Sequence, residues 1–131
     1  MKIATVIVRT LLGLLLLFAS TTYLFGLITP PPAEGALKAF NDGLAASVYL
    51  MPTAKIVELV CGLLFVSGRF VPLATVLIAP IAVNILGVHT FLAPEGLPIA
   101  IFVVAANLFL AWRHRDAYRG LFEATPTRQA G

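Results

Sequence analysis

Four long apolar stretches constrain this chain more than any other feature. They cover residues 3–28, 52–68, 70–92 and 97–118, and the last of them ends in a basic segment. A helix of about 20 residues crosses a hydrocarbon core of about 30 Å, so each stretch is long enough to span a membrane. None alternates apolar and polar residues as the strands of a membrane barrel do. The sequence therefore predicts an all-α integral membrane protein built as a four-helix bundle.

The composition supports one membrane domain over all 131 residues. Hydrophobic residues make up 60% of the chain and charged residues 11%, whereas soluble domains have about 45–50% and about 25%. The formal charge of +3 does not indicate a nucleic-acid partner, because the basic residues lie at the ends of the apolar stretches and form no basic surface.

The loop between the first two stretches opens with three prolines at residues 30–32. Apolar residues then recur at helical spacing: Leu37, Phe40, Leu44, Val48 and Met51. This pattern predicts a short amphipathic helix over residues 36–50, lying in the membrane interface; the alternative is an irregular surface loop. Residues 123–131 are expected to form a flexible tail.

The basic residues also predict an orientation. With both termini in the cytoplasm, seven of the nine lie on the inner side: Lys2, Arg9, Arg69, Arg113, Arg115, Arg119 and Arg128. Lys38 and Lys55 lie on the outer side, so the positive-inside rule favours this topology. A cleaved signal peptide is the alternative for the first stretch, but its apolar run continues to Ile28 without a good cleavage site.

No catalytic or metal-binding set is visible in the sequence. Cys61 is the single cysteine, so disulfide exchange within the chain is excluded. His89 and His114 are expected on opposite sides of the membrane, which excludes a site that they would share. The catalytic residues are unknown, no metal is expected, and an enzyme acting alone is the least supported class.

Polar side chains at membrane depth are costly and are candidates for function. With about 1.5 Å of rise per residue, Glu58 lies about 9 Å deep, Asn84 about 12 Å and Asn107 about 13 Å from the outer surface. The candidate ligand-binding residues are Glu58, Lys55, Asn84, Asn107, His89, Tyr23 and Thr22. They predict a polar site in the outer half of the bundle, with Glu58 at its centre.

The alternative is that these groups bond to one another and only fasten the helices. Asn84, for example, lies four residues after Pro80 and could simply satisfy the helical turn that the proline disturbs. Arg9 is expected to extend toward lipid phosphates. Trp112, Arg113, Arg115 and Arg119 are expected to anchor the last segment on anionic lipid.

Four segments carry a resemblance to a known family. They are RTLLGLLLLF at residues 9–18, KIVELVCGLLFVSGRFVPLA at 55–74, APIAVNILGVHTFL at 79–92 and LFLAWRHRDAYRGLF at 108–122. With these segments in this order, the chain resembles the DoxX-like family of small four-helix bacterial membrane proteins. The resemblance implies a multi-pass protein of the bacterial cytoplasmic (inner) membrane. It also implies a link to quinone redox, because the family takes its name from a membrane subunit of thiosulfate:quinone oxidoreduction.

One departure from the family pattern concerns Glu58, which with Arg9 and Gly62 matches a family-typical position. Relatives commonly carry a glycine followed by a lysine in the first helix, where this chain has ASTTY at residues 19–23. If that lysine pairs with the glutamate in relatives, Glu58 here must rely on Lys55 or be neutral.

The leading hypothesis is an accessory membrane subunit that binds a quinone or another hydrophobic small molecule, and that is at most a membrane subunit of an oxidoreductase. One alternative is a small proton-coupled transporter. Another is a purely structural membrane partner of a soluble redox enzyme. The lipid bilayer is the expected partner, and a soluble redox protein or a second copy of the chain are further candidates.

Overall fold

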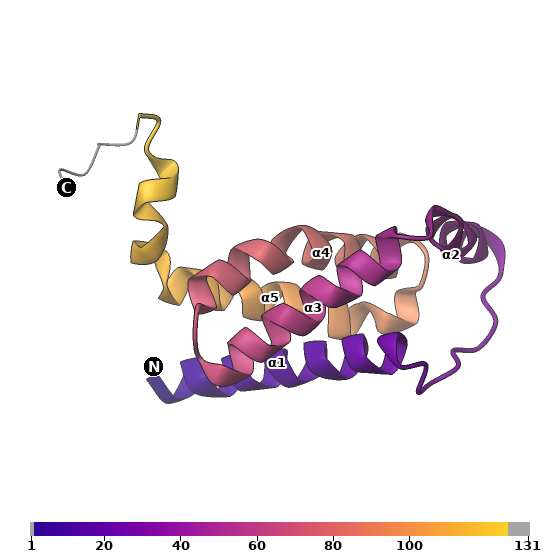
Figure 1. The fold of residues 1–131 in the computed structure, drawn as a ribbon, viewed down its shortest axis with the longest axis horizontal. Coiled ribbons are helices and arrows are strands. Elements are labelled where there is room, and N and C mark those ends of the chain that lie inside the picture. The colour runs from indigo at the N-terminus through magenta and orange to yellow at the C-terminus, as the bar shows by residue number, and fades with distance from the viewer. Residues whose placement is uncertain (1, 126–131) are drawn as a thin grey trace.

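The structure is a computed structural model that describes residues 2–125. These residues form helices and no β-strand (Figure 1), in the order α1 (Lys2–Leu24), α2 (Gly35–Ser47), α3 (Leu50–Ser67), α4 (Val71–Phe91), the 3₁₀ helix η1 (Pro94–Gly96), α5 (Leu97–Arg113) and the 3₁₀ helix η2 (Arg115–Phe122). Four segments are long and apolar enough to cross a membrane: α1, α3, α4 and Pro94–Arg113. The predicted all-α membrane bundle is thereby confirmed. Most of the expected flexible tail, residues 126–131, lies outside the described residues.

Glycines end two of the spanning helices. The apolar run continues to Ile28, but α1 ends at Leu24, because Gly26 adopts a left-handed conformation with φ +62°. The backbone N–H groups of Gly26 and Leu27 donate to the carbonyls of Tyr23 and Thr22, which is the Schellman pattern of a helix end. Gly68 ends α3, also in a left-handed conformation (φ +75°), and its N–H donates to the carbonyl of Leu64 at 3.0 Å.

The fourth spanning helix is shorter than the stretch of residues 97–118 that the sequence predicted. The α-helix stops at Arg113, and the polar segment after it continues as η2 in a different direction (Figure 1). Residues 114–118, expected at the end of the span, therefore lie outside α5.

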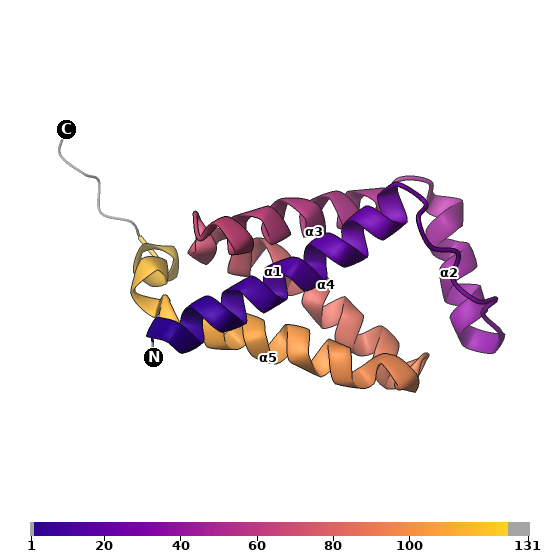
Figure 2. The same ribbon diagram turned by 90° about the horizontal axis from the view of Figure 1, so that it is seen from below.

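The bundle consists of two helix pairs, α1 with α3 and α4 with α5. Figure 2 shows the pairs close together at the end that holds the N-terminus and η2, which we call the narrow end. They diverge toward the end that holds α2 and η1, which we call the wide end. The core is packed from small and branched side chains, with Phe65, Leu12 and Leu16 among its largest fully buried members.

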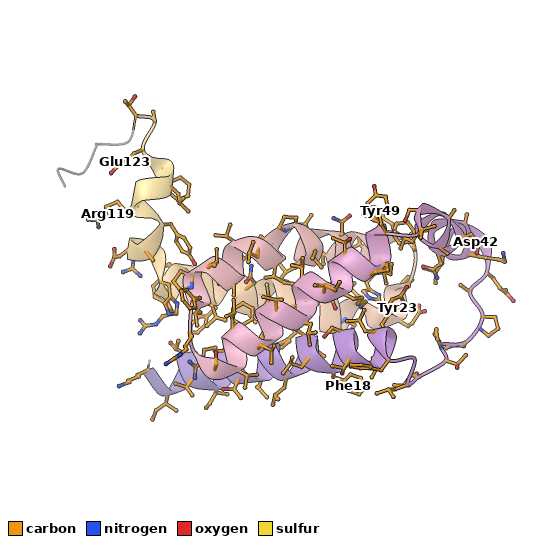
Figure 3. All side chains as sticks on the ribbon, viewed as in Figure 1. Phe18, Tyr23, Asp42, Tyr49, Arg119 and Glu123 are labelled. Atoms are coloured by element: carbon orange, nitrogen blue, oxygen red, sulfur yellow. The ribbon has the colours of Figure 1, made fainter. Side chains whose placement is uncertain are left out.

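The outer surfaces of the four spanning helices are apolar. Leu11, Leu14 and Phe18 on α1 are each more than half exposed, and Figure 3 shows Phe18 pointing away from the bundle. Exposed leucine and phenylalanine along spanning helices fit a lipid environment, where apolar side chains face the hydrocarbon.

A tight turn joins α2 to α3 at the wide end. Val48 has φ 70° and ψ −44°, and the N–H of Tyr49 donates to the carbonyl of Ser47 at 2.8 Å. This is a γ-turn of the rare form with positive φ, and it is strained because the central residue is β-branched. On its other side, α2 is joined to α1 by the proline-rich loop, and none of its residues is buried.

Candidate functional site

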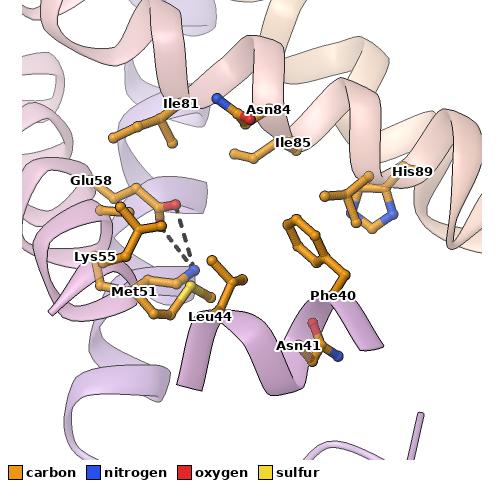
Figure 4. A pocket seen from close by; sticks show the side chains of 13 residues that line it. Phe40, Asn41, Leu44, Met51, Lys55, Glu58, Ile81, Asn84, Ile85 and His89 are labelled. Atoms are coloured by element: carbon orange, nitrogen blue, oxygen red, sulfur yellow. Dashed lines mark hydrogen bonds and ion pairs between the residues drawn. The ribbon is translucent and has the colours of Figure 1, made fainter. Parts of the chain in front are cut away.

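A cavity of about 430 Å³ lies at the wide end between α2, α3 and α4 (Figure 4). Its lining residues are Phe40, Asn41 and Leu44 of α2, Leu50, Met51, Ala54, Lys55 and Glu58 of α3, and Ile81, Asn84, Ile85, Val88 and His89 of α4. The volume falls in the range of about 300–1,000 Å³ that small-molecule sites occupy. The walls are mainly apolar, with a few polar groups facing one another across the space.

An ion pair forms the α3 wall of the cavity. Glu58 is 3% exposed, and the Lys55 ammonium lies 3.1 Å from its Oε2 and 3.5 Å from its Oε1. The two residues are three apart on α3, so their side chains share one face of the helix. Lys55 Nζ also lies 5.8 Å from the centre of the Tyr23 ring on α1. Lys55 is thus the basic partner of Glu58.

The side chain of Asn84, on the α4 wall, is oriented by the backbone carbonyl of Pro80. Its Nδ2 donates to the carbonyl of Pro80 at 2.9 Å. A carbonyl oxygen only accepts hydrogen bonds, so the amide nitrogen must face Pro80 and Oδ1 is the atom left over. The bond to the turn at Pro80 expected from the spacing is present, and Asn84 also lines the cavity.

His89 is held by the segment that follows α4. Its Nδ1 lies 3.0 Å from the carbonyl of Ala93, so Nδ1 carries the hydrogen and Nε2 has the lone pair in the neutral ring. The imidazole packs against Gly96, where a Cβ atom would overlap it. Glycine at this position therefore gives the ring its space.

The sequence model of the DoxX family matches residues 4–93. The chain belongs to the DoxX family. The searches of curated proteins and of solved structures found no match. The matched part of this DoxX-family chain runs from α1 through α4, and it contains every residue that lines the cavity.

The structure brings together four of the seven ligand-binding candidates of this DoxX-family chain. The residues that line the cavity are Lys55, Glu58, Asn84 and His89. Tyr23 does not line it, but its ring lies against the Lys55 ammonium. Thr22 does not reach it: the Thr22 hydroxyl donates to carbonyls of its own helix, at Phe18 (2.8 Å) and Ala19 (3.1 Å).

Asn107 lies elsewhere, in a second polar cluster toward the narrow end. Its Nδ2 donates to the carbonyl of Thr75 at 3.1 Å, and its buried Oδ1 has no partner among the described residues. The Thr75 hydroxyl donates to the Pro72 carbonyl at 2.7 Å and accepts a hydrogen bond from the Tyr118 hydroxyl, which ties η2 to α4. Asn107 lies past the middle of α5, toward Arg113, and its amide faces the Thr75 carbonyl of α4, which does not line the cavity.

The expected lipid anchors lie at the narrow end. The guanidinium of Arg9 packs over Gly68, and its buried Nε has no partner within residues 2–125. Arg9 therefore packs against the α3–α4 turn. Arg113 donates from Nε to the Thr5 hydroxyl at 3.1 Å, and the guanidinium of Arg115 lies 5.0 Å from the centre of the Trp112 ring. Arg119 is exposed on η2 (Figure 3).

The α2 wall contains the site residues that the sequence did not single out. Phe40 and Leu44 cover the cavity opposite α4 (Figure 4). Their helical spacing was visible and indicated an apolar face, but periodicity does not say which surface such a face covers. Within the described residues, no group of three His, Cys, Asp or Glu side chains is placed to hold a metal ion.

Proposed function

We propose that this DoxX-family protein is an accessory membrane subunit that binds a hydrophobic small molecule, with a quinone as the leading candidate, in the cavity between α2, α3 and α4. One observation carries the proposal: a mainly apolar space at the wide end of the bundle has Lys55 and Glu58 on one wall and Asn84 and His89 on another. Ligand sites typically combine apolar walls with a few converging polar groups in this way.

The chemistry of the cavity fits a quinone. Its flat ring is apolar on both faces, and Phe40, Leu44, Ile81 and Ile85 supply apolar surface around the space (Figure 4). Its polar ring substituents can meet the hydrogen-bonding groups of Asn84 and Lys55. Because α3 and α4 are spanning helices, a hydrocarbon tail attached to the ring would remain in the hydrocarbon region of the membrane.

Filling the cavity tests the proposal. The full chain, purified in lipid nanodiscs, is titrated with a short-chain quinone, and binding is followed by calorimetry. Ile85→Trp places a bulky side chain in the cavity and should weaken binding at least tenfold. Val83→Trp is the matched control, because Val83 is 66% exposed on the same helix and does not line the cavity. Equal affinity of both variants and the natural chain would contradict the proposal.

Two other results would replace the proposal with its alternatives. Solute uptake into proteoliposomes that depends on a pH gradient and on Glu58 would favour a proton-coupled transporter. Co-purification with a soluble redox enzyme, while the isolated protein binds no quinone, would favour a structural partner. Mass spectrometry of the lipids and quinones that co-purify with the native protein identifies the ligand directly.

A further inference from the structure

The polar side chains of the cavity offer a ligand unequal numbers of hydrogen-bond donors and acceptors. Four polar side chains line it from α3 and α4, and in each the contacts within the protein determine which atoms are left for a ligand. These contacts use part of the donor capacity, and the acceptor capacity left over exceeds the donor capacity left over.

On the α3 wall, Lys55 uses two of its three ammonium donors on the acceptor beside it. The Lys55 ammonium contacts both carboxylate oxygens of Glu58 and the face of the Tyr23 ring. A carboxylate can accept about four hydrogen bonds, and Lys55 is the single partner that the described residues give Glu58. Glu58 therefore has capacity for further donors.

On the α4 wall, two side chains have their donors turned toward backbone carbonyls. Asn84 uses one N–H on Pro80 and leaves Oδ1 unbonded, and His89 uses its Nδ1–H on Ala93 and leaves Nε2 unbonded. Within residues 2–125, neither of the two leftover atoms has a hydrogen-bond partner. The remaining donors are the third N–H of the Lys55 ammonium, the second N–H of Asn84 and the exposed amide of Asn41 on α2.

We infer that the cavity selects hydrogen-bond donors and takes a lipid-soluble quinol, whose ring bears hydroxyl groups, in preference to the corresponding quinone. This inference rests on the proposed function and specifies the form of its ligand. The ring oxygens of a quinone only accept hydrogen bonds, so they can use only the remaining donors and leave Glu58, Asn84 Oδ1 and His89 Nε2 without a hydrogen-bond donor. A quinol hydroxyl donates to these atoms, and donation to a carboxylate gives a short, charge-assisted bond.

Three probes with one ring and one alkyl tail separate the possibilities. They are a short-chain alkyl hydroquinone, its quinone, and the dimethyl ether of the hydroquinone, which keeps the shape and lacks both O–H groups. Each is titrated under strictly anaerobic conditions into the full chain in nanodiscs. The hydroquinone should bind at least tenfold more tightly than the quinone and the ether.

The substitution Glu58→Gln tests the acceptor directly. It keeps the side-chain volume but replaces one acceptor oxygen with an N–H donor, so hydroquinone affinity should fall about tenfold while quinone affinity does not fall. Glu123→Gln makes the same chemical change on the exposed residue after η2 and should leave the preference intact. Asn84→Leu, at a more exposed position, is a second variant that should reduce the preference if Glu58→Gln does not fold.

The outcomes distinguish this inference from the proposed function. Quinone binding that equals or exceeds hydroquinone binding overturns the donor selection and leaves the quinone site standing. A preference that persists in folded Glu58→Gln and Asn84→Leu variants also overturns it. Binding of none of the three probes means that the proposed function itself fails.

Discussion

Gly13 and Gly62 lie against each other where α1 crosses α3. A Cβ atom on Gly13 would lie 3.0 Å from the carbonyl oxygen of Gly62, and one on Gly62 would lie 3.1 Å from the carbonyl oxygen of Gly13. The two backbones are therefore in direct contact, as in other membrane helix pairs that associate through small residues. This crossing holds α3 and its Glu58 in place against α1.

Gly13→Ala should lower the stability of the protein by about 1–3 kcal/mol, because the new methyl group meets backbone atoms that move only if the helices separate. The nearest of them is the Val66 nitrogen, at 2.9 Å. Thermal unfolding in mild detergent measures the change. Gly87→Ala in α4 is the matched control, since nothing lies within 4 Å of its Cβ position, and it should be neutral or slightly stabilising. Equal losses in the two variants would rule out the close crossing as the cause.

Lys55→Met should destabilise the protein because it leaves the Glu58 carboxylate, 3% exposed, without its partner. Removing one member of a buried pair costs about 3–5 kcal/mol, and the lower end applies here because Lys55 keeps some exposure. The double variant Lys55→Met with Glu58→Gln should be more stable than Lys55→Met alone. A double-mutant cycle of unfolding temperatures checks this, and simple additivity of the two single losses would contradict it.

Val48→Gly should stabilise the protein by about 1 kcal/mol, because glycine adopts a positive φ without the Cβ clash of a valine. Little packing is lost, since Val48 is 80% exposed. Val48→Ala keeps the Cβ atom and should give no such gain. Unfolding temperatures of the three proteins decide the matter, and a higher stability of Val48→Ala than of Val48→Gly would show that the γ-turn is not the source of strain.

The basic residues predict that both termini are cytoplasmic, with the α1–α2 loop on the opposite side. A reporter that is active on one side of the membrane should therefore give opposite signals when it is inserted at Pro32 and when it is fused to Gly131. Signals of the same kind at both positions would refute the predicted topology.

The spanning helices were predictable because hydrophobic length is a property of each segment by itself. The spacing of Leu37, Phe40 and Leu44 likewise predicted a helix where α2 lies. The expected end at residue 50 was wrong, because the γ-turn at Val48 ends α2 at Ser47 and Met51 belongs to α3. The helix ends were less accessible to sequence reasoning. The stop of α1 depends on the left-handed Gly26. After α5 stops at Arg113, the chain continues as η2, which Tyr118 ties to Thr75 of α4.

The position of a candidate site residue was predictable only where its depth along a helix is enough to place it. Glu58 and Asn84 were counted from neighbouring outer ends, and they line one cavity. Asn107 was counted in the same way from Pro98, but depth does not say which neighbour a side chain faces, and its amide faces the Thr75 carbonyl instead of the cavity. Which helices form pairs, and that α2 covers the space between α3 and α4, depends on contacts between distant segments. Periodicity in one sequence contains no such information. The role of these residues in ligand binding stays a prediction.

The two helix pairs meet at the narrow end and diverge toward the wide end, so the angle between them determines how far apart they lie at the wide end. Helix α4 has 21 residues, which makes it about 32 Å long, so a rotation of about 5° at the Gly68 turn moves its far end by about 3 Å. Such a rotation changes the distance between Glu58 and His89 while the tightly packed Gly13–Gly62 crossing stays fixed. The width of the cavity thus depends on the angle between α3 and α4, which are joined by the turn at Gly68 over which Arg9 packs.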